Sequence, residues 1–180
     1  MKRILAFLLA SVLISASSAF SAYGENSEKN QIISEQRIAV KLNGAALLGV
    51  INPAIEIKVH DQFSVQLEGM GIFYPYGIPG TELPLNLGAT FLEAHWYPKG
   101  TFRGFYLGPN FGWGMWRLTK GLVPAYWGTY PDSYQVGTNI MAGLTLGYQF
   151  CIGKHWGIDI AWGLGYSNSA YEGHRTSDGS

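Results

Sequence analysis

Charged residues are scarce in this chain of 180 residues. Lys, Arg, Asp and Glu make up 13% of the sequence, against about 25% in typical soluble domains. The 12 basic and 12 acidic residues balance, so the formal net charge gives no reason to expect a nucleic-acid partner. Aromatic residues, at 14%, and 24 glycines are correspondingly abundant. This composition is unusual for a cytosolic enzyme and typical of a β-barrel whose outer wall faces lipid.

Cysteine and metal-binding patterns are also sparse. Cys151 is the only cysteine, which excludes an intrachain disulfide, and a free cysteine is most often a small apolar filler. The four histidines have no zinc-like spacing: His60, His95, His155 and His174. Short Gly-x-Gly fragments occur, but no helix is expected after them, as a dinucleotide motif would require. We therefore expect neither a metal nor a cofactor.

Only one long apolar run occurs, and it lies at the N-terminus. Two basic residues precede an apolar stretch over residues 4–14, and the small-x-small motif Ala19-Phe20-Ser21 follows. This order predicts a signal peptide over residues 1–21, with cleavage after Ser21 or, as an alternative, after Gly24. The apolar stretch is too short to span a bilayer as a helix. We expect the polar segment 22–35 to be a periplasmic arm and residues 36–180 to form the folded domain.

The hydrophobic period of the folded domain is two residues, which is the strand period. The clearest example is 54–60, where Ile55, Ile57 and Val59 alternate with polar residues. Asn52-Pro53 predicts a turn, and Pro109 predicts a bulge or weak point in its strand. The pattern predicts seven strands, over 36–50, 54–60, 63–74, 88–97, 103–116, 135–150 and 155–168.

The connections alternate between short turns, at 61–62, 98–102 and 151–154, and two long loops, at 75–87 and 117–134. Large apolar residues on one face of each strand and small or polar residues on the other are typical of an outer-membrane barrel. The sequence therefore predicts an all-β fold, an antiparallel transmembrane β-barrel of about eight strands in the bacterial outer membrane. Aromatic residues near strand ends are expected at the membrane interfaces: Tyr74, Tyr76, Trp96, Trp116, Trp127 and Trp156.

The strand count is odd, whereas single-chain bacterial barrels have an even number of strands. A missing strand would leave backbone groups unpaired in lipid. We therefore expect a final strand to be absent after Ser180. The weaker alternative is that the arm or the tail supplies an irregular eighth element.

Charged residues on the polar face are expected to line the lumen and to neutralise one another, because unpaired buried charges are costly. This predicted lumen network consists of Lys41, Glu56, Lys58, Glu68, Glu93, His95 and Asp159. An eight-stranded barrel is narrow enough to be filled by side chains, so an open porin is not expected. Glycines on the same face would make room for Tyr106 and Met141.

The block KLNGAALLGVINPAIEIKVHDQFSVQLEG, at 41–69, resembles the start of a Bacteroidetes family of short outer-membrane barrels, domain-of-unknown-function family 3575. The family pattern is matched by Lys41, Asn43, Asn52, Pro53 and Glu56. Glu93 in FLEAHWYPKG and the segment 148–166 are similar to its later strands, and the resemblance covers residues 36–172. Family members continue with one more strand. The resemblance implies an outer-membrane location and no known activity.

The leading hypothesis for function is a structural or surface-interaction role, with outer-membrane lipid and lipopolysaccharide as partners. The two long loops would contact a surface protein or glycan, and no enzymatic activity is expected. One alternative is a lipid-modifying enzyme that uses Glu93 and His95, with Ser64 or Ser167 as nucleophile. Another is a soluble secreted barrel that binds an apolar ligand.

Overall fold

The structure is a computed structural model that describes residues 13–18, 37–43, 50–74, 76, 84–119, 133–152 and 156–175, and these residues form β-strands and the turns between them. No helix capable of spanning a membrane occurs among these residues. The strands are β1 (Leu13–Ser18), β2 (Ile38–Asn43), β3 (Val50–Ile51), β4 (Pro53–His60), β5 (Phe63–Tyr74), β6 (Leu85–Trp96), β7 (Gly104–Thr119), β8 (Ser133–Ile152) and β9 (Trp156–Arg175).

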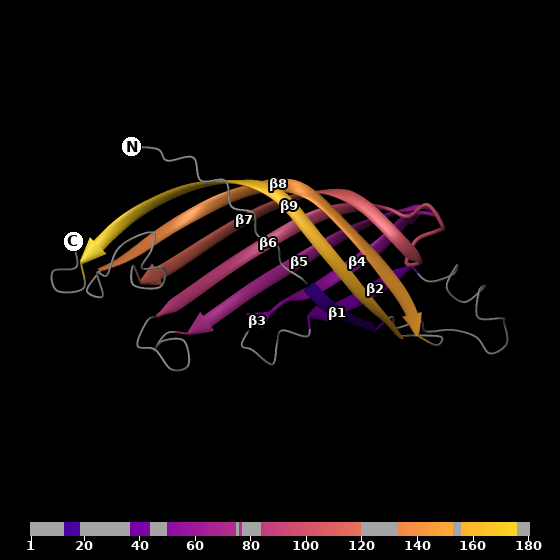
Figure 1. The fold of residues 1–180 in the computed structure, drawn as a ribbon, viewed down its shortest axis with the longest axis horizontal. Helices are drawn as coiled ribbons and strands as arrows, with labels where there is room; N and C mark the ends of the chain where they lie inside the picture. Colours follow the sequence, from indigo (N-terminus) through magenta and orange to yellow (C-terminus); the bar gives the residue numbers. More distant parts are fainter. Residues whose placement is uncertain are drawn as a thin grey trace.

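All the strands belong to one antiparallel sheet. Its order is β3-β5-β4-β2-β1-β9-β8-β7-β6, and β5 also pairs with β6. The long strands β5 to β9 lie side by side and bend together into an arch (Figure 1). β8 and β9 are 20 residues each and pair over their whole length.

Strands β3 and β4 pair with β5 in one common register, Val50 opposite Ile72 and Ala54 opposite Glu68. They are therefore one strand with an interruption at Asn52-Pro53, and the sheet has eight strands. The prediction of a turn at Asn52-Pro53 is wrong, because the chain continues in the same direction through these residues. Pro53 has no N–H to give to the ladder, so it interrupts the pairing without reversing the chain.

The eighth strand is β1, which lies inside the predicted signal peptide. It pairs with β2 on one side and with β9 on the other. The predicted arm 22–35 lies outside the described residues, and the predicted tail extends β9 to Arg175. The described part of the predicted tail therefore belongs to β9 and does not supply the eighth strand. Cleavage after Ser21 or Gly24 stays a prediction, and it would remove β1 from its place between β2 and β9.

The two faces of the sheet differ sharply in composition. Large apolar side chains project from one face and are exposed; in β9, for example, Trp156, Trp162 and Leu164 are 64%, 58% and 57% exposed. The opposite face carries most of the fully buried groups, and many of these are polar or charged. The alternation predicted from the sequence is therefore present, with the polar face inside and the apolar face outside.

The connection between β6 and β7 folds against the buried face at one end of the sheet. Tyr97 and Phe102 are 0% and 2% exposed, and Thr101 Oγ1 donates to the carbonyl of His60 at 2.9 Å. Phe102 has a positive φ of 67°, a strained conformation for a bulky residue. The described parts of the predicted long loops are strand ends, Tyr76 and Pro84. The other loop residues, including Trp127, lie outside the described residues.

The strand around Pro109 keeps one register against both neighbours. Pro109 lies opposite Leu144 of β8 without a shift. On the β6 side the ladder pairs Glu93 with Asn110 and Trp96 with Leu107, and it is interrupted between them. The predicted weak point is therefore an interruption on one side only, and β7 contains no register-shifting bulge.

Candidate functional site: a buried charged cluster

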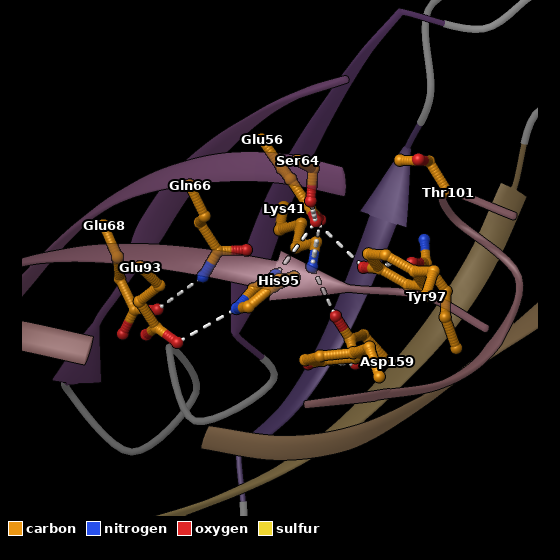
Figure 2. A network of polar contacts seen from close by, with 12 residues as sticks. Lys41, Glu56, Ser64, Gln66, Glu68, Glu93, His95, Tyr97, Thr101 and Asp159 are labelled. Carbon is orange, nitrogen blue, oxygen red and sulfur yellow. Dashed lines mark hydrogen bonds and ion pairs between the residues drawn. The ribbon is translucent and has the colours of Figure 1, made fainter. Parts of the chain in front are cut away.

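Glu56 of β4 is the centre of a buried cluster of polar side chains. Its side chain is 0% exposed. Its Oε1 accepts hydrogen bonds from the Ser64 hydroxyl, from His95 Nδ1 at 2.9 Å and from the Tyr97 hydroxyl at 2.9 Å (Figure 2). Its Oε2 lies 2.7 Å from Lys41 Nζ, an ion pair that is its only polar contact among the described residues. One carboxylate thus joins four donors from β2, β5, β6 and the turn that follows β6.

Lys41 of β2 holds two carboxylates at once. Its Nζ lies 2.7 Å from Glu56 and donates to Asp159 Oδ2 at 2.5 Å. Lys41 and Asp159 stand opposite Ser17 and Ser15 of β1, so this ion pair reaches across β1 and links β2 directly to β9. All three side chains are at most 3% exposed. Charges buried this deeply are stable only when paired, as they are here.

His95 of β6 lies between two carboxylates. Nδ1 is 2.9 Å from Glu56 Oε1, and Nε2 is 3.0 Å from Glu93 Oε2. An ionised carboxylate only accepts hydrogen bonds. The geometry therefore calls for a proton on both ring nitrogens, which makes His95 a second cation in the cluster.

Two tyrosines pack against these charges. The Tyr106 ring lies 4.5 Å from the His95 ring and 5.0 Å from that of Tyr97, measured between centroids. Lys41 Nζ is 5.5 Å from the Tyr106 centroid, within cation–π range. The Tyr106 hydroxyl donates to Asp159 at 2.8 Å. The tyrosines exclude water while satisfying carboxylate oxygens.

Glu68 of β5 forms a second, adjoining group. It accepts from Asn52 Nδ2 at 2.9 Å and from Gln66 Nε2 at 3.0 Å. The Glu68 and Glu93 carboxylates lie on the same side of the cluster (Figure 2). The buried Gln66 Oε1 has no hydrogen-bond partner among the described residues.

Of the seven residues predicted to form the lumen network, five lie in direct contact and Glu68 adjoins them. The seventh, Lys58, is placed at the end of β4 and pairs with Asp61 at 2.9 Å. That hydrogen bond and the lysine charge hold the pKa of the exposed Asp61 carboxyl below its usual range. The side chain of Lys58 therefore contacts the turn at 61–62, although its backbone lies in β4.

The aromatic residues predicted at strand ends are placed on different faces. Trp96 and Trp156 are exposed on the apolar face, and Tyr76 is 94% exposed after β5. Tyr74 is half-buried at the end of β5. Trp116 is half-buried too, and its ring lies 6.1 Å from that of Tyr171. These four described strand-end residues and Tyr76 thus occupy both ends of the sheet.

The cluster offers little to support hydrolytic chemistry through His95. The Ser64 hydroxyl donates to Glu56, and both nitrogens of His95 face carboxylates. A serine nucleophile needs a histidine nitrogen that is free to take its proton. Nor, among the described residues, are three His, Cys, Asp or Glu side chains placed so that they could hold one metal ion. What this arrangement does is fix six strands, β2, β4, β5, β6, β7 and β9, to one another through compensated charges and hydrogen bonds.

Comparison with known proteins agrees with the resemblance seen in the sequence. The model of a family described as protein of unknown function, DUF3575, matches residues 12–179. The chain belongs to this family. No curated protein and no solved structure matches the DUF3575 chain. The matched region includes β1 and every residue of the buried cluster.

Several members of the cluster were not singled out as network residues from the sequence. One of them is Gln149, whose Oε1 accepts a hydrogen bond from the Tyr97 hydroxyl at 3.2 Å. Tyr97, Tyr106 and Gln149 share the polar face of their predicted strands by period two, which was the available signal. Phe102 and Thr101 gave no such signal, because they lie in a turn that periodicity does not describe. Their inward position depends on the positive backbone angles at Gly100 and Phe102.

Proposed function

We propose that this protein is an outer-membrane β-barrel with a structural or surface-interaction role and a lumen filled by side chains. The observation that carries the proposal is the continuous apolar exterior. In β9 every second residue from Trp156 to Tyr166 is apolar and exposed. At about 3.3 Å per residue and a tilt of about 40°, this stretch rises about 25 Å. The apolar band of outer-membrane barrels has about the same height.

The exterior also weighs against a soluble barrel. A patch of a few hundred square ångströms is already large for a soluble monomer. Here the exposed apolar residues recur along β2 and β4 to β9 and include Val40, Ile57, Leu67, Phe111 and Leu146. Such an apolar surface is more stable in contact with the acyl chains of lipid than in contact with water.

The pairing of the strands supports closure of the barrel. Each of the eight strands has antiparallel partners on both sides, because β1 pairs with β2 and β9 while β5 pairs with β4 and β6. Over the stretches that these ladders cover in the described residues, no backbone edge faces hydrocarbon, which is the condition for a sheet within a bilayer.

The interior supports a filled lumen. The Lys41–Glu56–Asp159 ion pairs and the Tyr97 and Tyr106 rings occupy the buried face near the 97–104 turn. A porin would need a continuous water path there. Strands β5 and β7 end at the opposite end of the sheet from this turn. The loops that follow them would meet a surface protein, a glycan or lipopolysaccharide.

The test is conductance of the folded protein in planar bilayers, after its recovery from the outer-membrane fraction. We expect recovery in that fraction and no stable pore current. Recovery in the periplasmic fraction would contradict the membrane location. A steady porin-sized current would contradict the filled lumen and would place the ion-paired cluster outside the conduction path.

A further inference from the structure

Three side chains stack at the end of the sheet opposite the buried cluster. The Arg117 guanidinium lies 4.2 Å from the centroid of the Tyr134 ring. The His174 ring stacks on the same tyrosine, at 5.3 Å between centroids and 26° between planes. The residues come from β7, β8 and β9, and Tyr134 stands directly opposite His174. Three adjacent strands thus build one aromatic and basic group.

This rim group, Arg117, Tyr134 and His174, belongs to the exterior face and lies beyond its apolar band. Arg117 stands opposite the exposed Val136. The exterior positions of β8 are apolar from Ile140 to Ile152, whereas Thr138 is polar and exposed. In β9 the change falls between Tyr166 and Asn168. The rim group therefore lies one to four exterior positions past the point where the apolar band ends.

Arg117 is exposed, and within the described residues it forms no ion pair with a carboxylate. A guanidinium stacked on an aromatic ring is held in place, yet its N–H groups remain free around its edge. That planar array of donors matches the oxygens of a phosphate. His174 adds donors nearby and is charged when it is protonated.

We propose that the rim group is a binding site for the headgroup phosphate of an outer-leaflet glycolipid. The proposal rests on the proposed function, since it is the membrane that brings lipid headgroups to this height. Acyl chains of the same lipid would cover the apolar band directly below. A lipid fits this site better than a soluble phosphate does, because only a lipid would also contact the adjoining apolar band.

Glu172 is a negatively charged residue near the rim group, and its carboxylate would repel a phosphate. It lies on the exterior face of β9, opposite Val136, and its carboxylate is 4.0 Å from His174 Nε2. Its side chain is 86% exposed, so its repulsion of a phosphate is screened by water and salt. Glu172 also provides a test in the opposite direction, because removing its charge should strengthen phosphate binding.

The experiment counts lipids bound to the purified, folded full chain by native mass spectrometry in detergent. The probes are lipid A and the same lipid with its phosphates removed. The variants are Arg117→Gln, His174→Gln and Glu172→Gln, with Arg103→Gln, at the opposite end of the sheet, as the matched control. We expect a several-fold loss of bound lipid A for Arg117→Gln, a smaller loss for His174→Gln and a gain for Glu172→Gln. Arg103→Gln should bind as the unaltered protein does.

Equal binding of the two lipids, or equal binding by Arg117→Gln and the unaltered chain, would overturn the phosphate site. The barrel itself is scored separately on the same samples, by recovery in the outer-membrane fraction. Protein that reaches that fraction but does not discriminate the phosphate refutes the rim site alone. Protein that does not reach the membrane refutes both proposals.

Discussion

At the scale of the residue, Lys41 carries the largest electrostatic role in the buried cluster. It is the only cation in contact with both Glu56 and Asp159 among the described residues. Neither carboxylate reaches water, so neither has an alternative to its protein partners. The hydrogen bonds from Ser64, Tyr97 and Tyr106 satisfy the oxygens without supplying positive charge.

Replacing Lys41 by Met should therefore lower the free energy of unfolding by about 3–5 kcal/mol, the usual effect of leaving buried charge uncompensated. The measurement is urea unfolding of the protein in lipid vesicles, followed by tryptophan fluorescence. Lys58→Met is the matched control, because the Asp61 side chain it pairs with is 87% exposed. An exposed pair contributes only about 0–1 kcal/mol. Equal effects of the two substitutions would show that the cluster is not electrostatically compensated as described.

At the scale of the element, the sequence predicts where most strands lie but not the residues at which they begin and end. Period-two alternation located six of the seven expected strands and their outward faces, because a buried face imposes that period on every strand. It joined two strands in the run expected over 36–50, since β2 ends at Asn43 and Val50 pairs with β5 in register with β4. It failed at Asn52-Pro53, where tertiary pairing with β5 continues through a dipeptide that locally favours a turn. β1 was missed because its sequence satisfies the rules for a signal peptide.

The candidate site was predictable in composition rather than in geometry. Charged residues on the polar face were expected to pair. Alternation, however, carries no information about which strands bring their polar side chains together. The contact between Lys41 and Asp159, 118 positions apart, depends on the placement of β1, β2 and β9. The role of Tyr106 depends likewise on the approach of its ring to Gly147.

Among the described glycines, Gly108 is the one where an added Cβ atom would come nearest to another atom. A Cβ atom at this position would lie 1.6 Å from the Ala94 carbonyl oxygen, so β6 and β7 would have to separate. Gly108→Ala should lower the free energy of unfolding by about 1–3 kcal/mol, measured by the same urea titration. Gly163→Ala is the control, since a Cβ there meets nothing within 4 Å. A stability loss as large for Gly163→Ala would show that the close approach is not the cause.

At the scale of the whole molecule, the central feature is the reversal of the usual arrangement of a soluble protein. Charges are buried and paired, while large apolar residues are exposed on nearly every strand. The join between β2 and β9 has two components, the backbone ladders of β1 and the Lys41–Asp159 ion pair that crosses it. If the predicted leader is removed, the ion pair is the component that remains to connect those strands.

The most direct test of the membrane-barrel account is heat-modifiable mobility of the protein extracted from outer membranes. Unheated and boiled samples are compared on one detergent gel, with each cell fraction run alongside. The account predicts a band in the outer-membrane fraction that changes mobility on boiling, because a barrel resists detergent until heat separates its strands. A protein confined to the soluble fraction, with one mobility before and after boiling, would contradict it.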